Sequence, residues 1–165
     1  MIWILSLLSA YLYWVGGRGK EDPTPTFLAP LWLRDKIWKR AGCATIALAA
    51  VITGRGFDIS LWWVYILFWG LNFAALTTYH DYLGEEGTLP NGEKYREENI
   101  WSWMMTGFCY GLVAFPLYWT GVTWQMIMAR SALLTILIVA IRKIKNVHIQ
   151  ESGSGLVYIA SLPIL

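Results

Sequence analysis

Long apolar stretches separated by short charged segments make up most of the chain. A bilayer core of about 30 Å requires roughly 20 helical residues at 1.5 Å per residue. Two stretches of 21 residues carry no formal charge, and a third is interrupted only by Gln125 and Arg130 before it ends against Arg142. The pattern predicts an all-α, polytopic transmembrane helix bundle forming a single domain, with five spans at residues 2–15, 38–53, 59–79, 100–120 and 122–141.

The first and last apolar runs are shorter than a full span and leave alternatives open. The run at residues 2–15 resembles the start of a secretory signal, but no Lys or Arg precedes it, which favours a retained helix. The last ten residues, Leu156–Leu165, are too few to cross. We expect this C-terminal run either to re-enter the membrane from the cytoplasmic face or to lie flat on the interface.

A proline-punctuated link joins the first two predicted spans. It contains Pro23, Pro25 and Pro30 and leads into the amphipathic stretch Leu31–Trp38, in which three charged residues are flanked by large apolar ones. Such a stretch is typical of a helix that lies along the membrane interface.

Positive charges separate cleanly between alternate loops. The link at residues 16–40 holds six Lys and Arg, the loop at residues 80–99 holds two and the tail at residues 142–155 holds three, whereas the loop at residues 54–58 holds one and the turn at Gly121 holds none. Because cytoplasmic loops are enriched in Lys and Arg, this distribution places the N-terminus outside.

Composition supports a membrane environment and excludes other classes of protein. Apolar residues form 56% of the chain and charged residues 15%, with 11 Trp, 9 Tyr and 6 Phe. A net charge of +2 is too small for a nucleic-acid-binding protein. Cys43 and Cys109 both lie inside apolar runs, so we expect two buried thiols rather than a disulfide framework. We expect an integral protein of the plasma membrane of a prokaryotic cell.

The predicted topology gathers His80, Asp81, His148 and Glu151 at the cytoplasmic face. Imidazole and carboxylate groups are ligands for zinc, manganese or iron, so these four residues are candidate ligands of a divalent metal ion and candidate catalytic residues. The alternative is that they are ordinary polar groups at the ends of membrane helices. Arg142, Lys143 and Lys145 follow the fifth span and are candidate contacts for a lipid headgroup.

Arg130 is the only formal charge inside the fifth predicted span. A charged side chain near the middle of a membrane helix costs about 2.5 to 3.5 kcal/mol on insertion scales, so it needs a compensating partner or a function. We consider outward snorkelling, an internal partner such as Asn72 or Asp58, an anionic ligand or a catalytic role. If the C-terminal run re-enters the membrane, its carboxylate would reach a similar depth and would pair with Arg130.

Two local patterns predict backbone geometry. Gly107 and Gly111 form a Gly-x-x-x-Gly motif, which permits another helix to approach closely, either within the chain or in a second copy. Residues 84–94 contain Pro90-Asn91-Gly92, a sequence typical of a tight turn, so we expect a hairpin-like cytoplasmic loop.

No phosphate-binding loop, dinucleotide fingerprint, nucleophile elbow or thiol redox pair occurs in the sequence. Two functions therefore compete. The first is a non-enzymatic membrane module that self-associates, serves a partner membrane subunit or permeabilises the bilayer as holins do. The second is a membrane-embedded enzyme that acts on a lipid-linked substrate through the cytoplasmic residues, with a divalent metal ion as its candidate cofactor. Membrane lipids are the expected partners in both cases, and nucleic acid in neither.

Overall fold

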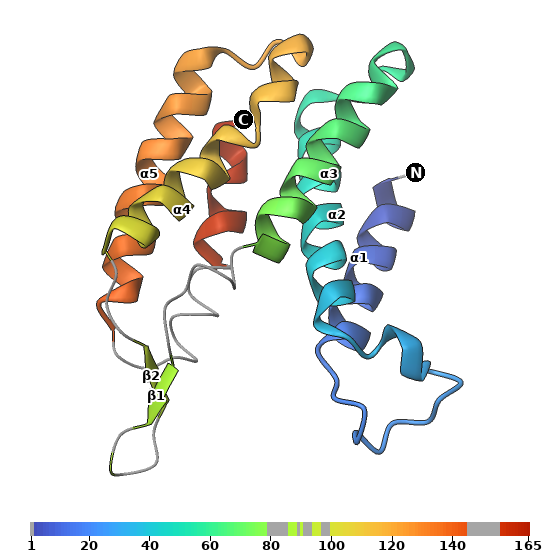
Figure 1. Ribbon diagram of the computed structural model, residues 1–165. Coiled ribbons are helices and arrows are strands. Elements are labelled where there is room, and N and C mark those ends of the chain that lie inside the picture. The colour runs from blue at the N-terminus through green and yellow to red at the C-terminus, as the bar shows by residue number, and fades with distance from the viewer. Residues whose placement is uncertain (1, 79–85, 89, 91–93, 97–99, 145–155) are drawn as a thin grey trace. The chain divides into compact units, whose positions relative to one another are not determined.

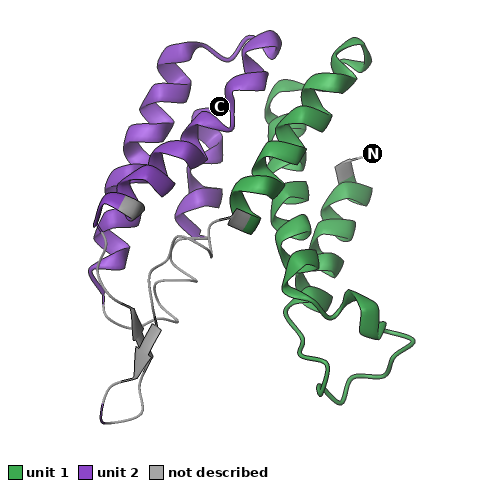
Figure 2. Cartoon of the chain, viewed as in Figure 1, with its two compact units in different colours: residues 1–77 green, residues 78–165 purple. Residues whose placement is uncertain are grey.

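Helices make up most of the described part of the chain, which also contains one small two-stranded hairpin (Figure 1). The structure is a computed structural model, and it describes residues 2–78, 86–88, 90, 94–96, 100–144 and 156–165. The chain divides into two compact units, residues 1–77 and residues 78–165 (Figure 2). A helix lies at each of the five predicted spans.

Unit 1 contains α1 (Ile2–Gly16), α2 (Lys36–Arg55) and α3 (Trp62–Thr78). The first two helices form an antiparallel hairpin whose backbones touch at glycines. A Cβ atom built on Gly42 would lie 2.8 Å from the Tyr13 backbone nitrogen, and one built on Gly16 would lie 2.9 Å from Lys39 Cα. The Ser9 hydroxyl also donates to the Gly42 carbonyl at 2.7 Å. Small residues thus allow these helices to pack closely, as membrane helices commonly do.

The link between α1 and α2 is folded around the buried side chain of Arg34. Its Nε donates to the Ala29 carbonyl at 2.8 Å and its Nη1 to the Asp22 carbonyl at 2.7 Å, and its Nη2 donates to the Thr24 carbonyl. These three bonds satisfy backbone acceptors in a segment that has few regular hydrogen bonds of its own.

The amphipathic stretch Leu31–Trp38 does not form a separate interfacial helix, contrary to expectation. Residues Leu31–Leu33 form a single 3-10 turn, η1, and α2 begins at Lys36. The break arises because Asp35 adopts an extended backbone and its carboxylate accepts from the Ile37 backbone N–H at 2.9 Å, which caps α2.

Unit 2 contains α4 (Ile100–Leu112), the 3-10 helix η4 (Phe115–Thr120) and α5 (Trp124–Arg142). The prediction of one continuous helix over residues 100–120 is therefore wrong. Pro116 has no backbone N–H, and its ring would clash with the carbonyl four residues earlier, that of Leu112, so the α-helix ends at Leu112 and a 3-10 helix follows. Gly121, at a φ of 89°, then reverses the chain into α5.

A hairpin and a short C-terminal segment complete the described part of unit 2. Strands β1 (Glu86–Thr88) and β2 (Lys94–Arg96) pair in antiparallel fashion, with Gly87 opposite Tyr95. This pairing confirms the predicted hairpin form of the loop. Residues 156–160 are helical and continue into the 3-10 turn η5 (Leu162–Ile164).

Two helical stretches, residues 59–77 and 124–142, are long and apolar enough to cross a membrane. By that criterion, five spans are not confirmed. The helix at residues 3–16 is apolar but shorter. Cys109 is exposed and Cys43 is half-buried, so the expectation of two buried thiols is wrong. An apolar run does not distinguish the side of a helix that faces other helices from the side that faces outward.

Candidate functional site around Arg130

The predicted cytoplasmic metal site lies outside the described residues. His80, Asp81, His148, Glu151 and Lys145 all fall in ranges that the structure does not describe. Within the described ranges, no group of three or more His, Cys, Asp or Glu side chains is arranged to hold a metal ion. The metal site and the catalytic role of these residues stay predictions.

Arg130 lies in the seventh position of α5 and is fully buried. Its side chain therefore does not snorkel outward, which was one of the alternatives. It bridges two other elements of unit 2. Nη1 donates to the Tyr110 carbonyl on α4 at 3.1 Å, and Nε donates to the Ser161 hydroxyl in the C-terminal segment at 3.0 Å.

The Tyr110 carbonyl accepts from Arg130 because α4 ends early. In a continuous helix this carbonyl would accept from the N–H of residue 114, but the Ala114 N–H donates to the Gly111 carbonyl at 3.2 Å. The carbonyls of the last helical turn are the ones that need partners from outside the helix. Pro116 thus ends α4 at the position that lets Arg130 bind its C-terminal turn.

The C-terminal segment closes the site with an aromatic ring. The Arg130 guanidinium carbon lies 5.1 Å from the centre of the Tyr158 ring, and that ring meets Tyr110 edge-on at a centroid distance of 5.4 Å. The expectation that the C-terminal run reaches Arg130 is confirmed through Ser161 and Tyr158. The proposed pairing of Arg130 with the terminal carboxylate stays a prediction.

The partners described for Arg130 are neutral: a carbonyl, a hydroxyl and an aromatic ring. Its Nη2 atom is buried and has no hydrogen-bond partner among the described residues. Hydrogen bonds to a charged group contribute about 1.5 to 3 kcal/mol each, so two of them and a ring contact offset the cost of burying the charge.

The chemistry of Ser161 favours a structural role for this cluster. Its hydroxyl donates to the Tyr158 carbonyl at 2.7 Å while it accepts from Arg130. A nucleophilic serine needs a base to take its proton, whereas this proton is held by a backbone carbonyl. The cluster is therefore suited to holding the C-terminal segment against α4 and α5.

The alternative internal partners considered for Arg130, Asn72 and Asp58, lie in unit 1, and pairing of Arg130 with either of them stays a prediction. Asn72 is fully buried on α3, and its Nδ2 donates to the Phe68 carbonyl at 2.6 Å. The Oδ1 atom of Asn72 is buried and has no hydrogen-bond partner among the described residues. The Asp58 carboxylate accepts from the Ser60 hydroxyl at 2.7 Å and the Ser60 backbone N–H at 2.9 Å, and these bonds lower the pKa of Asp58.

Gly107 and Gly111 face α5, as predicted. A Cβ atom on Gly107 would lie 2.5 Å from Thr135 Cα, and one on Gly111 would overlap the Ser131 side chain. Ser131 directly follows Arg130, so the close approach of α4 and α5 also sets the distance over which Arg130 reaches Tyr110. The motif is used within the chain.

Two of the three candidate headgroup residues are described, and they differ. The Arg142 side chain, in the last turn of α5, is buried, whereas Lys143 is exposed. Contact between these residues and a lipid headgroup stays a prediction.

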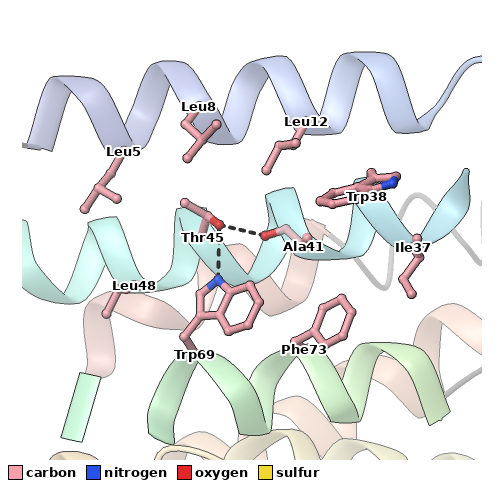
Figure 3. Close-up of a pocket in the computed structure, with 10 residues that line it drawn as sticks. All are labelled: Leu5, Leu8, Leu12, Ile37, Trp38, Ala41, Thr45, Leu48, Trp69 and Phe73. Atoms are coloured by element: carbon pink, nitrogen blue, oxygen red, sulfur yellow. Dashed lines mark hydrogen bonds between the residues drawn. The ribbon is translucent and has the colours of Figure 1, made fainter. Parts of the chain in front are cut away.

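Unit 1 contains a groove that the sequence did not indicate (Figure 3). It has a volume of about 480 Å³ and is lined by side chains of α1, α2 and α3, namely Leu5, Leu8, Leu12, Ile37, Trp38, Ala41, Thr45, Leu48, Trp69 and Phe73. The Trp69 indole N–H donates to the Thr45 hydroxyl at 3.1 Å, and that hydroxyl donates to the Ala41 carbonyl at 2.8 Å. The polar atoms of these side chains are thus engaged with each other, and the groove is apolar.

Comparison with protein-family models, with characterised proteins and with solved structures gives no match to this chain.

Proposed function

We propose that this chain is a five-span membrane protein that acts as a non-enzymatic membrane module. The observation that carries the proposal is the exposure of large apolar side chains on every helix. Trp3 on α1 is 82% exposed, Ile66 on α3 is 61%, Trp101 on α4 is 73% and Ile136 on α5 is 66%. On α2, Ile37 is 44% exposed. Apolar surface on this scale needs hydrocarbon or another apolar partner around each helix.

The polar groups inside the helices support a structural reading of the chain. Hydrogen bonds join one helix or segment to another at Ser9, Thr45, Arg130 and Ser161. A further bond, from the Thr45 hydroxyl to the Ala41 carbonyl, supports the bond between Thr45 and Trp69. Buried polar groups in membrane helices commonly serve this purpose. No described group among them has the arrangement of a nucleophile and its base.

The same packing limits how the module associates with partners. The Gly107 and Gly111 face is occupied by α5, so a second copy or a partner subunit would bind through other helical faces. The exposed aromatic and aliphatic side chains of α1 and α3 are the natural surfaces for such contacts.

A measurement of bound metal distinguishes the proposed membrane module from the alternative function, a metal-dependent membrane enzyme. The untagged chain would be purified in mild detergent beside a His148→Ala variant, and bound metal would be measured by mass spectrometry. We expect no stoichiometric metal in either preparation and a defined oligomeric mass. A stoichiometric metal that is lost in the variant would overturn the proposal and support a metal-dependent membrane enzyme.

A further inference from the structure

We infer that the groove in unit 1 holds one acyl chain of an anionic membrane lipid, whose headgroup is bound by Lys36 and Arg40. This inference rests on the proposed membrane function and names a partner for it. The groove volume of about 480 Å³ lies within the range of pockets that bind small molecules, roughly 300 to 1,000 Å³.

The interior of the groove disfavours water. A buried water needs two to four polar partners, and the polar side-chain atoms of Thr45 and Trp69 already bond each other or the backbone. In a bilayer the groove would be filled by hydrocarbon, because an empty apolar cavity loses dispersion contacts along its whole lining.

The dimensions of the groove suit an acyl chain. The lining residues of α2 extend from Ile37 to Leu48, a rise of about 16 Å at 1.5 Å per residue. Spread over that length, the volume gives a mean cross-section on the order of 30 Å², enough for an extended hydrocarbon chain. The length also matches one leaflet, about half of the 30 Å hydrocarbon core.

Two cations of α2 directly precede residues that line one end of the groove. In Figure 3, Leu12, Ile37 and Trp38 lie at one end and Leu5 and Leu48 at the other. Lys36 precedes Ile37 and is exposed, and Arg40 precedes the lining residue Ala41 and is half-buried.

The other cations of the link are engaged elsewhere. Arg18 binds Asp22 and lies over the Trp14 ring, Arg34 binds three backbone carbonyls, and Lys39 lies over the Tyr13 ring. The neighbouring Asp35 carboxylate caps α2. Among the described residues, no ion pair occupies Lys36 or Arg40, so these two charges complement an anionic headgroup.

The test compares binding of dioleoyl phosphatidylglycerol and dioleoyl phosphatidylcholine to the full-length chain in mild detergent, by native mass spectrometry and thermal melting. We expect one tightly held phosphatidylglycerol. The double variant Lys36→Gln, Arg40→Gln should bind phosphatidylglycerol about 10- to 30-fold more weakly, at the level of phosphatidylcholine. This is the loss expected when the attraction of two basic side chains for an anionic headgroup is removed. Lys20→Gln, an exposed cation of the same link, is the matched control and should change little.

A second pair of variants tests the groove itself. Leu8→Trp fills the groove and should abolish retention of either lipid, whereas Leu7→Trp, on the outward side of the same helix and 70% exposed, should not. Equal lipid binding by these two variants would overturn the inference, as would equal affinity of the native chain for both lipids. A change of oligomeric mass in Leu8→Trp without loss of lipid would also overturn it, because another protein surface would then occupy the groove.

Failure of the inference is distinguishable from failure of the proposed function. A chain that alkaline carbonate releases from membranes would contradict the proposed membrane function. A chain that resists extraction but holds no lipid in the groove would contradict the inference alone.

Discussion

Arg130 illustrates how one charged residue organises several elements. The sequence alone shows that Arg130 is unusual, because it is a charged residue in an otherwise uncharged run. Its partners follow from structure: the Tyr110 carbonyl depends on where α4 ends, and Ser161 depends on where the C-terminal segment turns back. The similar depths expected for Arg130 and for the C-terminal run predict that the two are in contact. No sequence signal identifies Tyr158 or Ser161 individually as the contacting residues.

The Arg130 bridge predicts energetic coupling across unit 2. Arg130→Gln and Ser161→Ala, made singly and together, should destabilise the chain less in combination than the two single effects add up to. We expect a coupling free energy of about 1 kcal/mol. Each single variant already loses the hydrogen bond between Arg130 and Ser161, so the double variant does not lose it a second time. Detergent melts monitored by circular dichroism measure it.

The matched control for this cycle is Arg55→Gln combined with Ser161→Ala. Arg55 lies at the end of α2 in the other unit and should show additive effects. Additive behaviour of Arg130 and Ser161 as well would contradict the bridge.

The lowered pKa of Asp22 predicts that the stability of the link between α1 and α2 depends on pH. Hydrogen bonds from the Thr24 side chain and backbone N–H, and the nearby Arg18 guanidinium, lower the pKa of Asp22 from its ordinary 3.8 to about 2. A lowered folded-state pKa means that the carboxylate stabilises the folded link above pH 3.8, and that this contribution is lost as the pH falls from 3.8 toward 2.

NMR titration of isotopically labelled Asp carboxyl groups in micelles measures this pKa directly. Thr24→Val removes the largest cause and should raise the pKa of Asp22 toward 3.8. Thr26→Val, an exposed threonine of the same segment, should leave it unchanged. An Asp22 that already titrates near 3.8 in the unmodified chain would contradict the described link geometry.

At the scale of elements, hydrophobic patterning located the helices but not their interruptions. The expected ranges 2–15 and 122–141 correspond closely to α1 (Ile2–Gly16) and α5 (Trp124–Arg142). The prediction of one helix over residues 100–120 is wrong, because apolar continuity conceals the effect of Pro116 on the backbone. The prediction of an interfacial helix at Leu31–Trp38 is wrong because the amphipathic pattern continues through the Asp35 cap.

Helix packing at Gly107 and Gly111 predicts a strong and local sensitivity to side-chain size. Leu at either position should separate α4 from α5 and destabilise the chain by about 1 to 3 kcal/mol or more, as overpacked interiors do. Detergent melts would measure the loss. Gly70→Leu on α3 is the matched control, because nothing lies within 4 Å of the Cβ position there. Equal melting temperatures for the Gly107, Gly111 and Gly70 variants would contradict the packing.

At the scale of the whole molecule, each unit is built around a glycine-mediated helical hairpin. In unit 1 the backbones of α1 and α2 meet at Gly16 and Gly42, and in unit 2 those of α4 and α5 meet at Gly107 and Gly111. Close packing within each hairpin leaves large apolar side chains on the outer faces. An antiparallel hairpin with an apolar exterior is the arrangement that two adjacent membrane spans require.

The proposed five-span arrangement predicts which turns are reached from each side of the membrane. With the N-terminus outside, the link and the hairpin would lie in the cytoplasm, and the turns at Gly56 and Gly121 would lie outside. Single cysteines at Lys20, Gly56, Pro90 and Gly121, in a chain lacking Cys43 and Cys109, would be treated with a membrane-impermeant maleimide on intact cells. We expect labelling of the Gly56 and Gly121 positions, and labelling of the other two only after permeabilisation.

Labelling at positions 20 and 56 tests directly whether α2, the predicted span with the least support, crosses the membrane. These positions flank α2, which carries Lys36, Lys39 and Arg40 in its first turns and does not meet the length and hydropathy criterion that α3 with its preceding turn and α5 meet. If α2 crosses the membrane, its basic end stays at the cytoplasmic surface and its apolar remainder, residues 41–53, reaches through most of the core. Labelling of both positions from the same side would show that α2 does not span, and would reduce the bundle to fewer spans.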